Sequence, residues 1–184
     1  MTTKQNDFLP EYDDPPKKVS GYINKFPEGE TKFRILSSPV TGYEGWKDRK
    51  PLRFKNLVDA MKQAPFETST YNPKGDPVYF WALIVWSYSD NAIKILNLKQ
   101  KTIQDKIKEL ANDPDWGDVK KFDIKVIKTG VDKETEYSVN PVPHKEITAE
   151  IELAFKDKPI NLEVLFSSGD PFEVVGNKQL TIPF

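Results

Sequence analysis

Cysteine is absent from this chain of 184 residues, and histidine occurs once. Without cysteine there is no disulfide and no thiolate zinc site, and His144 alone cannot build a histidine metal centre, so we expect no metal and no cofactor. No run of about 18 apolar residues is present, as a membrane helix would require. The first 14 residues lack the apolar centre of a signal peptide. We therefore expect a soluble, intracellular protein that does not enter a membrane.

Motifs of the common enzyme classes are also missing. The sequence contains no Walker loop, no His-Glu metal motif and no nucleophile elbow. His144 has no evident catalytic partner nearby in the sequence. Asp113, Asp115 and Asp118 do not have the spacing of an EF-hand loop and suit a solvated helix end. We expect a binding protein rather than an enzyme.

The sequence does contain a basic segment with large aromatic residues, at positions 42–55. It reads GYEGWKDRKPLRFK, in which Tyr43 and Trp46 stand among five cations and only two acids. Every base can stack on Tyr or Trp, at about 1–3 kcal/mol per base, while Lys and Arg neutralise the phosphates. The segment therefore indicates contact with a single nucleic-acid strand. The alternative is that Trp46 covers an edge of the core.

The net charge of −1 is low for a nucleic-acid-binding domain, but it is unevenly distributed. Residues 1–145 hold 24 Lys and Arg against 21 Asp and Glu, whereas residues 146–184 hold 3 against 7. Such an acidic end can compete with nucleic acid for a basic groove or offer a docking site to partner proteins.

The hydrophobic pattern predicts a mainly β domain over residues 19–145. Strands are predicted at 31–36, 78–86, 93–96, 121–128 and 136–139. A helix capped by Thr102 separates the third strand from the fourth. This is the order of a five-stranded OB-fold barrel with one internal helix. An OB-fold binds its ligand across strands two and three, framed by the loops after strands one and four, so residues 43–55 occupy a framing loop.

The strand at 78–86 is apolar on both faces. Tyr79 and Trp81 share one face, while Phe80 and Trp86 share the other. One face must lie in the core, and the other is either a base-stacking platform or covered by the segment 56–77. Both interpretations remain open from the sequence.

The two ends of the chain differ from this domain. Residues 1–18 are polar and rich in proline, which predicts a flexible N-terminal arm. Residues 146–184 are predicted to form a helical, acidic C-terminal extension, because Ile147, Ile151 and Phe155 stand at helical spacing.

We expect four aromatic residues to stack on bases and eight basic residues to follow the phosphate backbone. The stacking residues are Tyr43, Trp46, Tyr79 and Trp81. The phosphate contacts are Arg34, Lys47, Arg49, Lys50, Arg53, Lys94, Lys125 and Lys128.

Several short stretches of the chain also match, in their order, stretches of a known family. They are FRIL at 33–36, GY at 42–43 with Trp46, KPLR at 50–53, YFWA at 79–82, WG at 116–117, FDIK at 122–125, TG at 129–130 and YSV at 137–139. In these stretches, over about residues 25–145, the chain resembles the bacteriophage single-stranded DNA-binding proteins related to the helix-destabilising protein of T-even phages. The resemblance implies sequence-independent binding of single-stranded DNA in phage or prophage replication, recombination and repair, in the cytoplasm of the bacterial host.

The chain departs from that family in two ways. The T-even members carry a zinc subdomain built on Cys and His, which cannot exist here. Their basic N-terminal arm for cooperative binding is replaced by a mixed-charge arm that holds Asp7, Glu11, Asp13 and Asp14. We therefore do not expect cooperative binding through that arm.

The last three residues, Ile182, Pro183 and Phe184, are similar to the Pro-Phe tip with which bacterial single-stranded DNA-binding proteins recruit replication and repair enzymes. The resemblance implies docking of replication or recombination proteins. The acids that precede such a tip are replaced here by residues 179–181.

Two other functions fit the same sequence. An OB-fold module could bind RNA instead, because stacking and phosphate contacts do not distinguish the two polymers without a reader of the 2′-hydroxyl. Alternatively, the aromatic face could bind another protein, because exposed aromatic patches rimmed by charge also mark protein interfaces.

Overall fold

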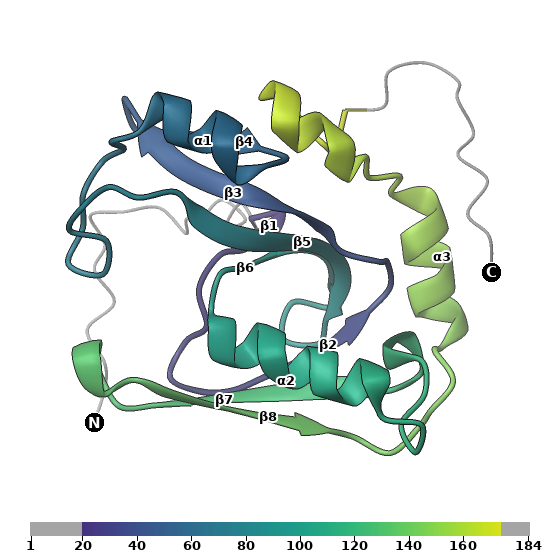
Figure 1. Ribbon diagram of the computed structural model, residues 1–184. Helices are drawn as coiled ribbons and strands as arrows, with labels where there is room; N and C mark the ends of the chain where they lie inside the picture. Colours follow the sequence, from purple (N-terminus) through teal and green to yellow (C-terminus); the bar gives the residue numbers. More distant parts are fainter. Residues whose placement is uncertain (1–19, 174–184) are drawn as a thin grey trace, which may run out of the picture.

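The computed structural model describes residues 20–173 as a mainly β structure built on one mixed sheet of eight strands (Figure 1). The strands are β1 (Tyr22–Ile23), β2 (Gly29–Ile35), β3 (Val40–Lys47), β4 (Lys50–Phe54), β5 (Val78–Ser87), β6 (Ala92–Leu98), β7 (Asp123–Thr129) and β8 (Glu136–Pro141). The mainly β prediction is confirmed. The prediction of five strands is wrong, because β1, β3 and β4 are additional strands.

The sheet is open rather than closed on itself. Its strand order is β1-β6-β5-β2-β7-β8, with β3 also paired to β5 and β4 paired to β3. The β1–β6 pair is parallel and the other pairs are antiparallel. Within residues 20–173, the end strands β1 and β8 are not paired with each other, so a closed barrel is not confirmed.

Strands β2 and β3 both pair with β5, and a bulge separates the two paired regions. Ile35 pairs with Val85 and Val40 pairs with Ala82, so the four residues between Ile35 and Val40 lie opposite only two on β5. Such a bulge bends the strand and increases its twist. As a result, β3 and its partner β4 extend beyond the part of the sheet that holds β7 and β8 (Figure 1).

The helices are short and lie around the sheet. They are α1 (Leu57–Gln63), α2 (Lys101–Asn112) and α3 (Ala149–Asp157), with 3₁₀ turns η1 (Val119–Lys121), η2 (Asp132–Glu134) and η3 (Leu162–Ser167). The predicted helix after the third strand exists, but Thr102 lies inside it and Gln100 is its N-cap residue. α1 lies outside the one-helix OB-fold order, at the place where the sequence indicates a short helix-like piece around residues 57–61. Among the described residues, no helix has the length and apolar character needed to cross a membrane.

Two apolar cores lie on opposite faces of β5 and β6. The inner core joins β2, β5, β6, β7 and α2 through residues such as Phe33, Leu83 and Ile107. The outer core joins Phe80, Ile84 and Trp86 of β5 to residues of α3 and η3. The outer face of β5 is therefore covered by the C-terminal helical segment, whereas the alternative interpretation assigned this cover to residues 56–77.

Candidate nucleic-acid interface

The basic segment 42–55 is a β-hairpin formed by β3 and β4, not a loop. Lys47 pairs with Lys50, and Asp48 and Arg49 form a two-residue turn with φ values of 51° and 60°. Positive φ at both positions gives this turn the twist that antiparallel strands require. The segment after α1 holds the tip, because the Arg49 N–H donates to Glu67 Oε1 over 2.8 Å and the Glu67 N–H donates to the Trp46 carbonyl over 2.8 Å.

The aromatic residues of the hairpin point to two opposite faces. Trp46 and Glu44 stand two residues apart on β3 and therefore share one face, here called the indole face. The Trp46 indole N–H donates to Glu44 Oε1 over 3.1 Å. Tyr43 lies on the other face, here called the tyrosine face, where its ring centre is 5.4 Å from that of Tyr79 on β5. Trp46 is 41% exposed and Tyr79 is 38% exposed, so each face offers an aromatic surface to a ligand.

The indole face is organised around the Glu44 carboxylate, which is only 1% exposed. Besides Trp46, the carboxylate accepts hydrogen bonds from Arg53 Nε, over 2.8 Å, and from Lys99 Nζ. The amide of Asn97 lies 3.5 Å from it. Burial alone would raise the pKa of Glu44, but Lys99, Arg53 and the indole N–H together outweigh burial and hold the pKa below its usual value. Glu44 is therefore ionised at neutral pH.

The base of the indole face is covered by η3. A Cβ atom at Gly42 would lie 2.7 Å from the Phe166 ring, so glycine allows this close approach. Lys55 Nζ lies 2.8 Å from the Glu163 carboxylate of η3 and 5.3 Å from the centre of the Phe166 ring. Nearer the tip of the hairpin, Trp46 remains 41% exposed on this face.

The tyrosine face is partly covered by the segment that follows α1. The Phe66 ring packs directly on Gly45, where a Cβ atom would lie 2.1 Å from a ring carbon. Lys47 Nζ lies 5.6 Å from the centre of the same ring. Tyr43 is half-buried beside this contact, and Tyr79 remains exposed.

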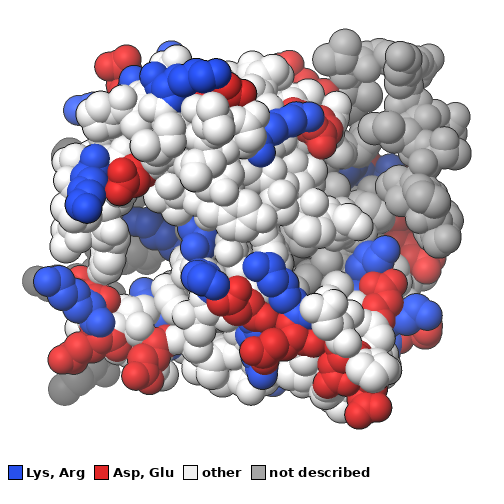
Figure 2. All heavy atoms as spheres, in the orientation of Figure 1, with Lys and Arg blue, Asp and Glu red and all other residues white. Residues whose placement is uncertain are grey.

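Among residues 20–173, three cations at the hairpin tip have no acidic partner. Arg49 and Lys50 are exposed and Lys47 is half-buried. Within the described part of the chain, these three side chains form no ion pair, whereas Lys55, Arg53 and most other basic residues near the hairpin do. Figure 2 shows a broad uncharged surface over the α1 and β5 part of one face, with Lys and Arg side chains along both its upper and its lower edge.

Three of the predicted contact residues are buried, which removes them from the predicted contact surface. Trp81 is 6% exposed because it belongs to the inner core. Lys94 is 6% exposed, and its Nζ lies 2.7 Å from Asp90 Oδ2 in the preceding turn. Arg34 is 1% exposed, and its Nε donates to Asp123 Oδ1 over 2.6 Å.

Arg34 belongs to a buried polar cluster rather than to a binding surface. The Asp123 carboxylate also accepts a hydrogen bond from the Tyr88 hydroxyl over 2.8 Å, and Lys32 Nζ lies 3.0 Å from it. Burial alone would raise the pKa of Asp123, but the hydrogen bonds from Lys32, Tyr88 and Arg34 hold it below its usual value. Burial and the hydrogen bond to Asp123 raise the pKa of Tyr88 to about 12. The cluster therefore ties β2 to β7.

The predicted contacts on β7 are separate from the hairpin. Lys125 pairs with Glu30 over 3.2 Å, and Lys128 is half-buried near the end of the strand. β7 lies at the bottom of the molecule in Figure 1, whereas the β3–β4 hairpin lies at the top. The structure thus brings together Tyr43, Trp46, Lys47, Arg49, Lys50, Arg53 and Tyr79, and leaves the β7 lysines apart.

Two residues of this site, Glu44 and Lys99, were not predicted from the sequence. Glu44 and Lys99 organise the indole face. The only sequence signal for this role was that Glu44 stands two residues before Trp46, on the same face of the strand.

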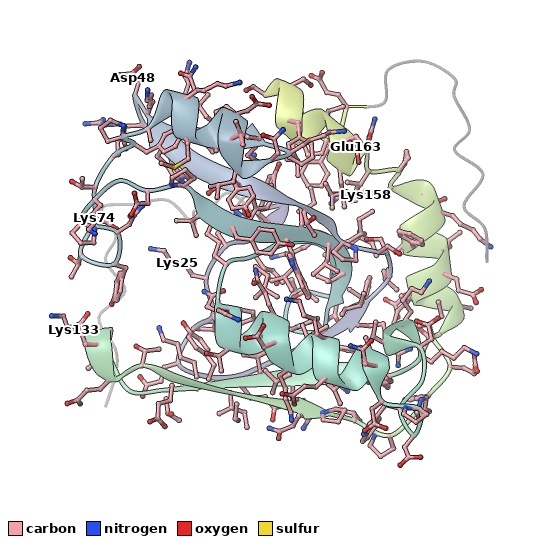
Figure 3. The ribbon with its side chains drawn as sticks, in the orientation of Figure 1. Lys25, Asp48, Lys74, Lys133, Lys158 and Glu163 are labelled. Atoms are coloured by element: carbon pink, nitrogen blue, oxygen red, sulfur yellow. The ribbon has the colours of Figure 1, made fainter. Side chains whose placement is uncertain are left out.

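Figure 3 shows Lys25, Lys74 and Lys133 on one side of the molecule, although they come from three distant segments of the chain. All three are exposed. The fold alone brings these three lysines to the same side of the molecule, and no local sequence pattern predicts it.

No metal centre is indicated in the described residues, where no group of three or more His, Asp or Glu side chains is suitably placed. His144 stacks on Trp116, with ring centres 5.8 Å apart, and its Nε2 lies 2.6 Å from the Trp116 carbonyl oxygen.

The N-terminal arm (1–18) and the tip residues Ile182, Pro183 and Phe184 lie outside the described residues.

Comparison of this chain with protein-family models, with curated proteins and with solved structures found no match.

Proposed function

We propose that this protein binds single-stranded DNA without sequence preference. The observation that carries the proposal is the tip of the β3–β4 hairpin, where the 41% exposed Trp46 lies within a few residues of Lys47, Arg49 and Lys50. An exposed aromatic ring beside uncompensated cations is the pairing that single-strand binding requires, because the ring stacks on a base and the cations contact the adjacent phosphates.

The connectivity of the sheet supports this proposal. Strands β2, β5, β6, β7 and β8 are placed in the order β6-β5-β2-β7-β8, and α2 connects β6 to β7. An open OB-fold has this connectivity, and its ligand is framed by the loops after its first and fourth strands. In this chain the hairpin follows β2 and the turn with Lys133 follows β7, so both framing segments carry basic residues.

The biological setting follows from the sequence resemblance to phage single-stranded DNA-binding proteins. On this proposal the protein coats single-stranded DNA in a bacterial host during phage or prophage replication, recombination and repair. Ile182, Pro183 and Phe184 would then recruit replication or recombination proteins. A pull-down of host replication proteins with and without these three residues tests that part, and equal recovery would exclude it.

Tryptophan fluorescence, titrated with a poly(dT) oligomer of about 30 nucleotides at low and high salt, tests the function. We expect quenching by the single strand and not by duplex DNA of equal length. If the three tip cations each neutralise one phosphate, the slope of log affinity against log salt is about −2, at about −0.7 per phosphate. Trp46→Ala should weaken binding by about 1–3 kcal/mol. An affinity that is insensitive to salt would contradict the proposal.

Two outcomes of the same assay would favour the other candidates. Equal or tighter binding of a matched RNA oligomer would indicate an RNA-binding module. No response to any nucleic acid would favour a protein-binding scaffold, for which α1 offers an apolar surface. Its exposed apolar residues are Leu57 (44%), Val58 (68%) and Met61 (50%).

A further inference from the structure

Glu44 is an acidic residue at a place where the proposed ligand carries negative charge. Its carboxylate is 1% exposed and accepts hydrogen bonds from donors on β3, on β4 and just beyond β6. A carboxylate near phosphates should weaken nucleic-acid binding by charge repulsion. Its presence in the middle of the indole face therefore needs an explanation other than charge.

We propose that Glu44 is a positioning residue, which holds Trp46, Arg53 and Lys99 in the arrangement that receives a single strand. This inference rests on the proposed function and deepens it.

The contact with Trp46 fixes the edge of the indole and leaves the ring faces free. The indole has one donor, Nε1–H, and Glu44 Oε1 accepts it over 3.1 Å. A base stacks on the face of the ring, so the hydrogen bond restrains the side chain without occupying the stacking surface. A restrained ring loses less rotational freedom when a base binds, which increases affinity.

The contacts with Arg53 and Lys99 hold two flexible cations on the same face. Arg53 Nε donates to Glu44 Oε2 over 2.8 Å, and Arg53 also lies 5.6 Å from the Phe80 ring centre. The Lys99 side chain is 33% exposed, so it retains access to solvent while bonded to Glu44. Because two cations share one carboxylate, Arg53, Lys99 and Glu44 together carry a net positive charge, which can bind a phosphate.

Glu44→Gln tests the proposal by the direction of its effect on affinity. The substitution keeps the size of the side chain and removes the negative charge. If Glu44 acts only through charge, affinity for the poly(dT) oligomer increases. If Glu44 positions the indole and the cations, affinity decreases, and we expect a loss of about fivefold or more, within the range of one lost stacking contact.

Glu163→Gln is the matched control. Glu163 pairs with Lys55 beside the same face, but its side chain is 60% exposed and it contacts neither Trp46 nor Lys99. Figure 3 places it on η3. We expect equal or slightly tighter binding for this variant.

A readout in the free protein separates positioning from a general loss of stability. In a ¹H–¹⁵N spectrum, the indole N–H signal of Trp46, assigned with Trp46→Phe, should shift in Glu44→Gln, while the signals of the other three tryptophans remain in place. In the Trp46→Ala background, Glu44→Gln should lose less affinity than it does in the wild type, because part of its effect passes through the indole. An unchanged indole signal, or fully additive losses, would overturn the proposal.

The remaining outcomes are also decisive. If Glu44→Gln does not fold, Glu44→Asp keeps the charge and shortens the reach, and the same indole shift and loss of affinity are expected. If the wild type binds no single strand, the proposed function fails and the inference fails with it. If the wild type binds and Glu44→Gln binds equally or more tightly, the proposed function stands and the positioning role is overturned.

Discussion

Arg49 occupies a backbone conformation that suits glycine better. Its φ is 60° and that of Asp48 is 51°, in a two-residue turn for which Asn-Gly and Asp-Gly are the favoured pairs. For residues other than glycine, this left-handed conformation costs about 1–2 kcal/mol. On the proposed function, a phosphate contact made by the guanidinium would offset this cost.

Arg49→Gly should therefore separate stability from binding. We expect the free energy of unfolding to rise by about 1 kcal/mol, because the strain is relieved, and single-strand affinity to fall several-fold, because one phosphate contact is lost. Urea unfolding and the poly(dT) titration measure the two effects. Arg49→Ala is the control, because it loses the guanidinium and keeps the strain, so it should lose affinity without gaining stability.

Asp123→Asn should destabilise the fold through the buried Arg34. Removing one partner of a buried ion pair leaves an uncompensated charge, at a cost of about 3–5 kcal/mol. Because the folded pKa of Asp123 is lowered, the ionised carboxylate stabilises the fold above its unfolded pKa of about 3.9, and this contribution is lost as the pH falls through the folded pKa. Urea unfolding between pH 7 and pH 3 should show a flatter pH dependence for the variant. Equal stability of the two proteins at pH 7 would contradict this account.

At the scale of elements, the hairpin tip can be exchanged without changing the register of the sheet. Gly45 pairs with Leu52, so replacing residues 46–51 by Asn-Gly leaves a shorter hairpin with a two-residue turn. Both apolar cores keep all their residues, so we expect the circular dichroism spectrum to be retained and single-strand binding to be lost.

The turn between β7 and β8 provides the control for this exchange. Thr129 pairs with Glu136, so residues 130–135 can be replaced by the same Asn-Gly turn. We expect a smaller loss of affinity than for the hairpin tip. Equal losses in the two variants, or no loss in either, would show that the hairpin is not the main contact.

Strands with a clear period of two were predictable from the sequence, and the hairpin was not. The runs that became β2, β5, β6, β7 and β8 alternate or are continuously apolar, whereas β3 and β4 are dense in charge and glycine. Their pairing depends on the turn at Asp48 and Arg49, which lacks the usual glycine signal. The burial of Arg34 could not be predicted from the sequence either, because its partner Asp123 lies 89 residues further along the chain.

At the scale of the whole molecule, the C-terminal helical segment is part of the folded unit. Ile151, Leu162 and Leu165 are buried against the outer face of β5 and β6. Truncation after residue 145 exposes that face, and we expect a large loss of stability with increased binding of a hydrophobic dye. Truncation after residue 173 keeps every outer-core residue among those that the structure describes, so we expect this shorter protein to remain stably folded. Similar stability of the two truncated proteins would contradict this expectation.

The outer core also means that the outer face of β5 and β6 is made before the helices that cover it. The residues of β5 and β6 leave the ribosome before the residues that cover them, since Leu165 lies 67 positions after Leu98. At about 5–20 residues per second, the apolar outer face is not fully covered for about 3–13 s in each new chain. During that interval a growing chain presents Phe80, Ile84 and Trp86 to its surroundings, so we expect it to be most prone to aggregation before α3 and η3 have been made.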